Sequence, residues 1–298
     1  MFSSCYYLQF LDISNFDTSK GIKMENMFFD CNFLTSLNVS SFDTSQITNM
    51  QNLFCGCRSL KYLDVKNFNT SNVRIMSKMF GEMSQLIELD LSNFDTKNVE
   101  DMSYMFQYCN SLTTVNIKGF DTRKLMNLYR MFDSCQNLKD VDLSSFDTTL
   151  LTSFSSMFIN CKNLLSVNFG NLYKRKVRYL DSMFSGCSSL SSLHLTSFDT
   201  SNLGDASSMF NGCRSLVNIK MDNFQSSNAI SLNSMFYSCS SLTSLYLPYL
   251  DTSNIGNNGI DLMFEGCRNL NLFINMKKCQ NLISTLPSYV KPINIENY

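Results

Sequence analysis

Cysteine is the residue type whose placement first suggests chemistry. The chain has 298 residues and 12 cysteines, and ten of the cysteines recur at one regular interval: Cys5, Cys31, Cys57, Cys109, Cys135, Cys161, Cys187, Cys213, Cys239 and Cys267. Aligned thiols can form disulfides or bind zinc. Only one histidine accompanies them, and Met83 fills the same slot in one repeat, so a soft apolar group suits the position better. We predict buried free thiols without a metal or redox role, and expect the off-pattern Cys55 and Cys279 to be more reactive.

A second series consists of aspartates within a recurring Phe-Asp-Thr segment: Asp17, Asp43, Asp95, Asp121, Asp147, Asp199 and Asp251. Paired carboxylates can perform acid–base chemistry or bind calcium. However, an Asp or Asn side chain followed by Thr also caps a turn or a helix N-terminus, and Asn69 replaces Asp in one copy. The series therefore indicates turn capping.

His194 is the only histidine, and it stands at a position expected to face outward from a strand. The sequence contains no Gly-x-Ser-x-Gly, Walker or zinc-protease motif that would give it a catalytic neighbour. We predict a surface residue. The chain is accordingly predicted not to be an enzyme, with no catalytic residue, cofactor or metal.

One segment departs from the Phe-Asp-Thr pattern. It carries four cations beside two tyrosines, in the order Leu172, Tyr173, Lys174, Arg175, Lys176, Val177, Arg178 and Tyr179. Lys174, Arg175, Lys176 and Arg178 could bind an anionic polymer or a phosphate-rich surface. Sequence drift in a tolerant turn explains the same residues, and the sequence does not decide between the two.

All these residues are placed by a repeat of 26 residues, which the Met-Phe dipeptide marks most clearly, as at Met79, Met105 and Met131. We number each repeat from this Met. Position 2 is Phe, position 5 usually Cys and position 8 Leu; positions 11 and 13 are aliphatic, and position 16 is usually Phe. A fixed period of this length predicts one structural unit stacked on copies of itself.

Within one repeat, the alternating Leu-x-Leu at positions 11 to 13 predicts a short strand. After the Phe-Asp-Thr turn, apolar residues follow at offsets of three, three, one and three, as in Val99, Met102, Met105, Phe106 and Cys109, which we interpret as a short amphipathic helix. The predicted fold is an α/β leucine-rich-repeat solenoid of about ten rungs, with a parallel sheet on one face and short helices on the other. It should span residues 1–275. Residues 276–298, with Pro287 and Pro292, should form a C-terminal cap.

Composition narrows the possible functions. The 24 basic and 25 acidic residues nearly balance, so no overall field indicates nucleic acid as a partner. No apolar run approaches the roughly 20 residues that span a bilayer. Residue 1 already lies within a repeat, so we expect sequence upstream of Met1, and the absence of a signal peptide says little about compartment.

Outward strand positions 10 and 12 offer a candidate partner-binding surface: Tyr62, Asp64, Glu88, Asp90, Asp140, Asp142, His194 and Tyr246. The acidic members should cluster near the middle of the sheet, which favours a protein partner with a basic patch. Alternatively, these polar residues only keep an exposed sheet soluble.

The repeat Met-Phe-x-x-Cys-x-x-Leu-x-x-Leu-x-Leu-x-x-Phe-Asp-Thr-Ser-x-Val closely resembles that of the BspA-like leucine-rich-repeat surface proteins, a bacterial surface lipoprotein type. Residues 105–125 show the match, with Phe106, Cys109, Leu112, Val115, Ile117, Phe120, Asp121 and Thr122 in place, while Arg123 replaces Ser and Leu125 replaces Val. The resemblance covers about residues 1–275. It implies a cell-surface or secreted protein that adheres to host proteins or other cells, and we expect any lipoprotein anchor to lie outside residues 1–298.

We therefore predict a non-catalytic protein-interaction or adhesion module that binds a protein partner, such as a host extracellular or cell-surface protein, through its strand face. Nucleic acid and membrane insertion are not expected. A structural spacer or stalk without a discrete binding site is the alternative, and a carbohydrate-binding module using Tyr62 and Tyr246 is a third reading.

Overall fold

The computed structural model describes residues 1–147, 149–170 and 176–295. The chain forms two compact units. The first contains Met1–Leu150 with Asn168–Gly170, and the second contains Leu151–Val167 with the described part of Asn171–Tyr298. Each unit is described by itself.

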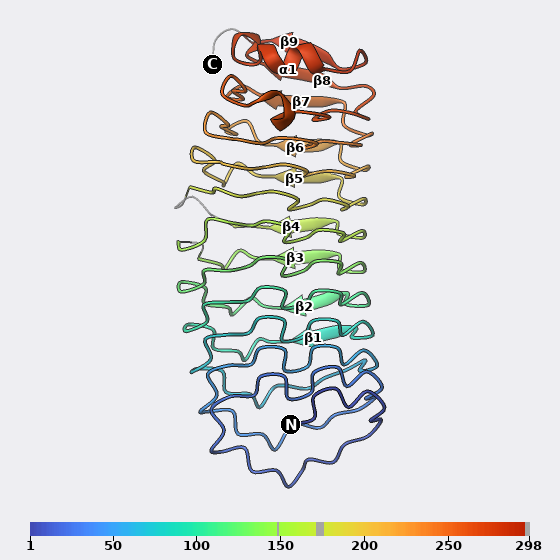
Figure 1. Cartoon of the computed structure of the whole chain (residues 1–298), viewed down its shortest axis with the longest axis vertical. Helices are drawn as coiled ribbons and strands as arrows, with labels where there is room; N and C mark the ends of the chain where they lie inside the picture. The colour runs from blue at the N-terminus through green and yellow to red at the C-terminus, as the bar shows by residue number, and fades with distance from the viewer. Residues whose placement is uncertain (148, 171–175, 296–298) are drawn as a thin grey trace. The chain divides into compact units, whose positions relative to one another are not determined.

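The first unit contains the strands β1 (Glu88–Asp90), β2 (Thr114–Asn116) and β3 (Asp140–Asp142), and β4 (Ser166–Asn168) spans the boundary between the units (Figure 1). β1 and β2 pair in parallel with Leu89 opposite Val115. Leu89 is buried while its neighbours Glu88 and Asp90 are exposed, which is the alternation expected for a sheet covered on one face. A second line of parallel bridges runs through the non-strand side, from Lys23 through Asn49, Ile75 and Asp101 to Asn127.

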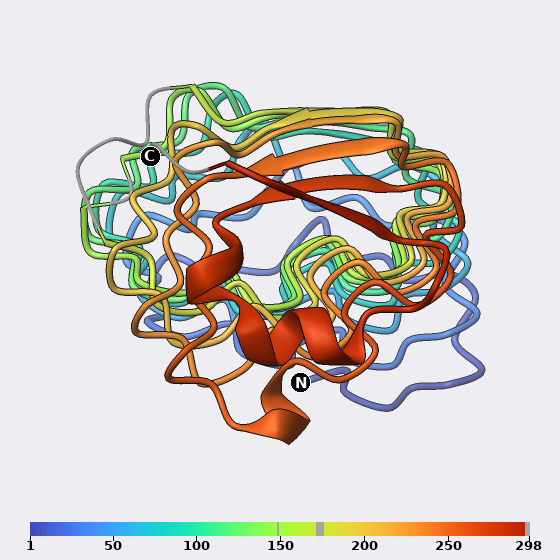
Figure 2. The ribbon, with the colours of Figure 1, turned by 90° about the horizontal axis from the view of Figure 1, so that it is seen from above.

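The second unit contains β5 (Ser192–His194), β6 (Asn218–Lys220), β7 (Ser244–Leu247), β8 (Asn271–Ile274) and β9 (Lys291–Asn294). β5 pairs in parallel with β6, and β7, β8 and β9 form a parallel three-stranded sheet. Its helical segments are η1 (Asn257–Gly259), η2 (Met276–Lys278) and α1 (Gln280–Thr285). Figure 2 shows α1 on the side of this unit opposite β8 and β9.

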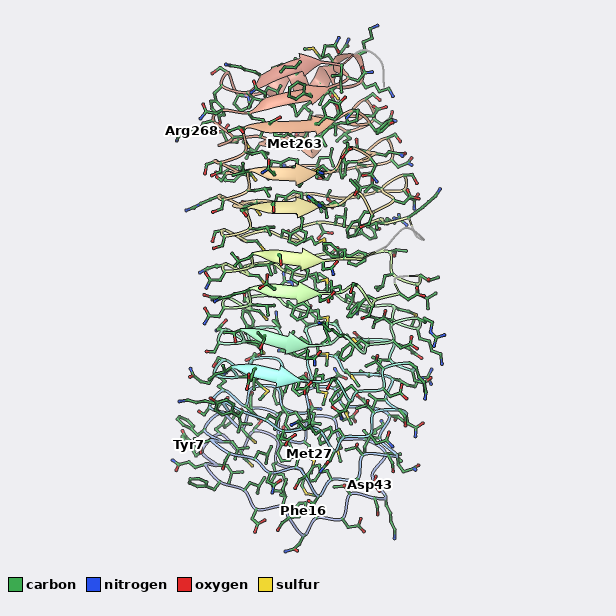
Figure 3. The ribbon with its side chains drawn as sticks, turned by 180° about the vertical axis from the view of Figure 1, so that it is seen from behind. Tyr7, Phe16, Met27, Asp43, Met263 and Arg268 are labelled. Atoms are coloured by element: carbon green, nitrogen blue, oxygen red, sulfur yellow. The ribbon has the colours of Figure 1, made fainter. Side chains whose placement is uncertain are left out.

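The predicted apolar columns form the core of both units. The position-2 phenylalanines Phe28, Phe54 and Phe80 have no exposed surface, and their rings stack with centroids 5.7 and 5.9 Å apart. The same stacking recurs in the second unit, where Phe184 lies 5.7 Å from Phe210. Figure 3 shows Met27 and Met263 each in the interior of its own unit. Parallel strands, a repeated rung and merged apolar columns confirm the predicted solenoid fold.

The short helix predicted in every rung was wrong, because the described residues there form successive tight turns and the longest helix, α1, has six residues. Cys31 N donates to Phe28 O and Leu34 N to Cys31 O, both at 3.2 Å, which are three-residue turn bonds. Other N–H groups leave the rung: Phe28 N donates to Leu53 O at 3.0 Å and Asp30 N to Cys55 O at 2.8 Å. Apolar offsets of three therefore marked turn corners, since a helix has 3.6 residues per turn.

Left-handed residues make this turn pattern possible. Asn26 and Asp30 have φ values of +58° and +56°, and two equivalent residues recur in most rungs, for example Tyr104 and Tyr108 at +58° and +60°. A left-handed residue turns its neighbouring N–H groups out of the rung, so that they can reach the next rung instead of the preceding turn. Glycine tolerates this conformation best, which explains Gly56, Gly186, Gly212 and Gly266 at position 4.

The rung count also differs slightly from the prediction of about ten, because eight repeats, those of β1 to β8, carry a strand among the described residues. The first strand begins at Glu88, so the first three repeats carry the motif without a regular strand. There, Thr35 N lies 3.3 Å from Gln9 O, a length beyond the usual range for an N–H···O bond. Weak pairing at this end of the stack explains the difference.

Candidate interaction surface

A shallow groove of about 740 Å³ lies on the strand face of the first unit. Five of the eight residues in the predicted partner-binding set line it: Tyr62, Asp64, Glu88, Asp90 and Asp142. Its floor is formed by β1 and β2, whose alternation turns every second side chain outward. Tyr62 is 64% exposed at one end of the groove. The structure thus brings the central part of the predicted surface together.

The other three residues of the predicted set lie elsewhere. Asp140 is exposed on β3 but does not line the groove. His194 and Tyr246 belong to the second unit, His194 being paired across the sheet with Lys220 and Tyr246 lying 6.0 Å from the ring of Phe273. The prediction of a single binding surface therefore stays a prediction, with its residues divided between the two units.

The aspartates of the groove accept hydrogen bonds from backbone N–H groups. Asp64, Asp90 and Asp142 each accept an N–H two residues on, at 3.0 Å, and so close an Asx turn at the end of the strand. Asn116 Nδ2 also donates to Asp90 Oδ1 from the next rung at 3.1 Å. The hydrogen bond from Ser92 N lowers the pKa of Asp90, and the hydrogen bond from Ser144 lowers that of Asp142. Both groups are anionic at neutral pH.

Two lysines that were not included in the prediction also line the groove, namely Lys66 and Lys118. They stand at position 14, two residues after the capping Asp or Asn. Their charges contribute to lowering the pKa of Asp90 and Asp142, respectively. The surface therefore has a carboxylate centre and a cationic margin. Their shared position in the repeat relates the two lysines in the sequence, but the direction of their side chains depends on the turn after the strand.

Of the predicted anion-binding set, Lys174 and Arg175 lie outside the described residues. Lys176 is exposed, and its backbone forms a parallel bridge with Asp199. The Arg178 guanidinium lies 5.3 Å from the ring centroid of Tyr179, a cation–π contact. Binding of an anion by this segment stays a prediction.

The thiols of the position-5 column are buried, as predicted, apart from the partly exposed Cys5. Most of the buried Sγ atoms donate to the carbonyl of a position-2 Phe in the preceding rung, as in Cys135 Sγ to Phe106 O at 3.0 Å and Cys213 Sγ to Phe184 O at 3.1 Å. Burial raises the pKa of Cys213 to about 12. No group of three or more metal-binding side chains is found in the described parts of the chain.

The expectation that Cys55 and Cys279 are the reactive thiols was wrong. Both are fully buried, and burial raises the pKa of Cys55 to about 12 and that of Cys279 to about 11. Cys279 Sγ also donates to the Leu250 carbonyl at 3.3 Å. These two cysteines lie outside the position-5 column, but they are not exposed.

The Phe-Asp-Thr segment caps turns, as predicted, but Thr has a different partner. Asp43 Oδ1 accepts Ser45 N at 2.9 Å, whereas the buried Thr44 hydroxyl donates to Asn69 O at 2.9 Å and accepts Asn69 N at 2.7 Å. Asp thus closes its own turn, and Thr joins its rung to the next. No helix in the described residues is long and apolar enough to cross a bilayer.

Comparison with solved structures finds leucine-rich-repeat proteins from bacteria. A leucine rich cell surface protein from Faecalibacterium prausnitzii A2-165 is 17% identical, with a TM-score of 0.49, over 92% of this chain and 77% of that one. A leucine-rich repeat protein from Bacteroides ovatus ATCC 8483 is 19% identical, with a TM-score of 0.47, over 93% of this chain and 82% of that one. No curated protein matches the chain.

One protein family matches almost the whole chain. Its description is "Mycoplasma protein of unknown function, DUF285", and its three overlapping matches cover residues 1–113, 83–192 and 178–286. These matches follow the repeat through both units and end close to α1. The chain belongs to this family of repeat proteins.

Proposed function

We propose that the chain is a non-catalytic interaction module that binds a protein partner through the groove of the first unit. The observation that carries this proposal is the groove itself, which is lined by the outward side chains of several consecutive rungs. It is shallow and largely polar, whereas small-molecule sites are usually enclosed and mostly apolar. A broad open surface of this kind suits a macromolecular partner.

The charge pattern of the groove indicates the chemistry of that partner. Asp64, Glu88, Asp90 and Asp142 outnumber the two lysines at the margin. A basic segment would therefore be attracted toward the centre, and the exposed ring of Tyr62 at one end of the groove offers a face for a cation. Because the aspartates also close turns, they are held in place before the partner arrives.

The environment of the candidate catalytic residues supports a non-catalytic role. Lowered pKa values make Asp90 and Asp142 weak bases at neutral pH. Burial keeps thiols such as Cys213 protonated, and the thiolate is the reactive form. Adhesion at the cell surface, or after secretion, is part of the same proposal and rests on the motif resemblance.

A basic probe peptide tests the proposal. We would label a short peptide of alternating Lys and Ser and measure its binding to the full chain by fluorescence anisotropy. The E88Q/D90N variant should weaken binding at least about fivefold at low salt, since two charges leave the groove. Asn at position 90 can still accept the turn hydrogen bond, as Asn69 does in its own turn. Y62S should weaken binding as well, with Ser already present at the equivalent Ser36.

The matched control is D17N/D43N, which removes two charges from the same unit at Asx turns outside the groove. Figure 3 shows Asp43 at the edge of the unit opposite Tyr7. If the control weakens binding as much as E88Q/D90N does, attraction is non-specific and the groove is not the site. Equal binding by the wild type and both groove variants would favour the spacer alternative.

A further inference from the structure

A side wall of the second unit carries a row of exposed cations on alternate rungs. Position 6 of its rungs is occupied in turn by Lys162, Ser188, Arg214, Ser240 and Arg268. Lys162, Arg214 and Arg268 are exposed, and none of them takes part in the ion pairs found among the described residues. We call these five residues the basic wall. In the first unit, by contrast, Arg58 at the same position is paired with Glu82.

Backbone hydrogen bonds keep the basic wall straight. Two residues before each of the wall positions 188, 214 and 240, an N–H donates to the next rung: Gly186 N to Asn211 O at 2.7 Å, Gly212 N to Tyr237 O at 2.8 Å and Ser238 N to Glu265 O at 2.7 Å. The wall serines add their own contacts, since the Ser188 hydroxyl faces Lys162 O at 3.3 Å and the Ser240 hydroxyl faces Arg214 O at 3.4 Å. The register of the cations is therefore set by the fold.

The spacing follows from this register. Rungs joined by backbone hydrogen bonds lie about 4.8 Å apart, so cations on alternate rungs are about 10 Å apart, and the three of them span about 20 Å. Figure 3 shows Arg268 at the outer edge of its unit, pointing away from Met263 in the interior. The three guanidinium and ammonium groups thus face solvent along one line.

The residues that follow the wall position in each rung are mostly polar and include no anion at positions 7 and 9. These two positions also have no aromatic residue in the same five rungs, and most are Ser, Asn or Thr. At position 3 stands Glu265, whose Oε1 accepts the Tyr289 hydroxyl at 2.8 Å. Hydroxyl and amide groups between the cations offer hydrogen bonds to a ligand that is itself rich in hydroxyl groups.

We propose that the basic wall binds a linear anionic polysaccharide lying along the stack of rungs. Single-stranded nucleic acid is usually held by aromatic side chains that stack on its bases, and the wall has none. A sugar polymer that carries sulfate or carboxylate groups matches both the line of cations and the hydroxyl-rich surroundings.

Heparin is the probe for the experiment, with neutral dextran and single-stranded oligothymidine as comparison ligands. We would measure their binding to the full chain by surface plasmon resonance at several salt concentrations. The variant K162S/R214S/R268S makes all five wall positions serine, so the fold already accommodates each change. It should bind heparin about tenfold more weakly or worse, with a reduced dependence on salt.

The matched control, K20S/K61S/K139S, removes three cations of the first unit that have no ion pair among the described residues. It should retain wild-type affinity for heparin. The proposal is overturned if the wall variant binds heparin like the wild type, or if the control loses as much affinity. It is also overturned if oligothymidine binds more tightly than heparin at equal salt, because the wall would then be a nucleic-acid surface.

Discussion

At the scale of single residues, the Thr of each Phe-Asp-Thr segment joins neighbouring rungs, a role that the local sequence pattern does not reveal. The Thr44 hydroxyl is buried and makes two hydrogen bonds with Asn69 in the next rung. Sequence reasoning assigned this Thr to a local cap because its neighbours in the chain were the only partners in view. The partner in fact lies 25 residues away, and only the stacking of the rungs brings the two together.

Replacing Thr44 by Val tests this role. Val has nearly the same shape but no hydroxyl group, so the N–H and C=O of Asn69 lose their partner in a place closed to water. We expect a loss of about 1–3 kcal/mol of unfolding free energy, measured by urea denaturation. T44S, which keeps the hydroxyl as Ser226 does naturally, should lose less. Equal losses in the two variants would show that the methyl group matters instead.

The turn-capping aspartates should make stability depend on acid. Hydrogen bonds lower the pKa of Asp121, Asp142 and Asp199 below the ordinary value of 3.8. A lowered pKa in the folded state means that the contribution is present above about pH 4 and is lost as the pH falls further. Thermal melting recorded from neutral pH downward should show Tm falling steeply below about pH 4. In D142N the fall should be smaller, and an identical profile would contradict the assignment.

Buried thiols give a third prediction at this scale. Burial raises the pKa of Cys213 and Cys55 to about 12, so neither forms a thiolate at neutral pH. Under native conditions, labelling with iodoacetamide at pH 8 and mass spectrometry should find modification at Cys5, which is partly exposed, long before any other cysteine. Complete labelling is expected only in denaturant. Rapid native labelling of Cys55 would restore the original expectation that it is reactive.

At the scale of the rung, sequence predicted the strand correctly and the helix wrongly. The alternation around Leu89 requires one buried face and one exposed face, which is a property of the local chain. The turns depend instead on residues such as Tyr104 and Tyr108 adopting a left-handed conformation, which their residue type does not favour. Hydrogen bonds to the next rung, such as Tyr108 N to Asp133 O at 2.8 Å, stabilise that conformation.

Glycine substitutions separate backbone conformation from packing in these turns. Gly56 and Gly212 are both left-handed, with φ values of +79° and +75°. A Cβ at position 212 would have ordinary space, 3.8 Å from Gly186, whereas at position 56 it would overlap Asp30 Oδ1 and lie 3.0 Å from Asp30 Cα. G212A should therefore cost about 1 kcal/mol, from conformation alone, and G56A clearly more. Urea denaturation would measure both, and similar costs would argue against crowding at Asp30.

The groove was predictable in part for the same reason as the strand. Positions 10 and 12 face outward wherever a strand alternates, which placed Tyr62, Glu88 and Asp90 correctly. Lys66 and Lys118 were missed because they follow the strand, where the direction of a side chain depends on the turn. Only the structure shows that these turns aim both lysines at the groove.

At the scale of the whole molecule, the family match and the observed repeat confirm the recognition of a leucine-rich-repeat protein. Recognition was possible because the period survives along the chain even where single residues vary. The regular period could not show that the described chain clusters into two compact units. Nor could it reveal the weak strand pairing in the first three repeats.

Deletion of one repeat tests whether the rung is the unit of folding. Removing residues 79–104 deletes one whole repeat and joins Lys78, the last residue of a repeat, to Met105, the first residue of a later one. The remaining rungs keep their register, so the protein should still fold, with a lower free energy of unfolding. Removing only residues 79–91 deletes half a repeat, which shifts the apolar positions of the later rungs against those of the earlier ones and should prevent folding. Circular dichroism and urea unfolding of the two proteins would distinguish them. A folded half-repeat deletion would contradict the rung model.

Residues 276–298 were expected to form a cap, and we propose that Tyr289 is its key residue. Its hydroxyl accepts Gly266 N at 2.9 Å, whereas the equivalent Gly212 N donates to a carbonyl of the following rung. The side chain thus takes the place of a further rung. Y289F should speed hydrogen exchange at the Gly266 amide while leaving exchange at Gly212 unchanged. Unaltered exchange at Gly266 would refute this role.

The separate roles of Asp and Thr in the Phe-Asp-Thr turn have an evolutionary consequence. Each repeat contains both the Asp that closes its own turn and the Thr that bonds the next rung, so duplicating the gene segment in whole repeats adds a complete rung. The exposed positions of the repeats can then change independently of the buried ones, as the groove of the first unit and the basic wall of the second unit illustrate. Such a protein can gain new binding specificities through added repeats while its fold stays the same.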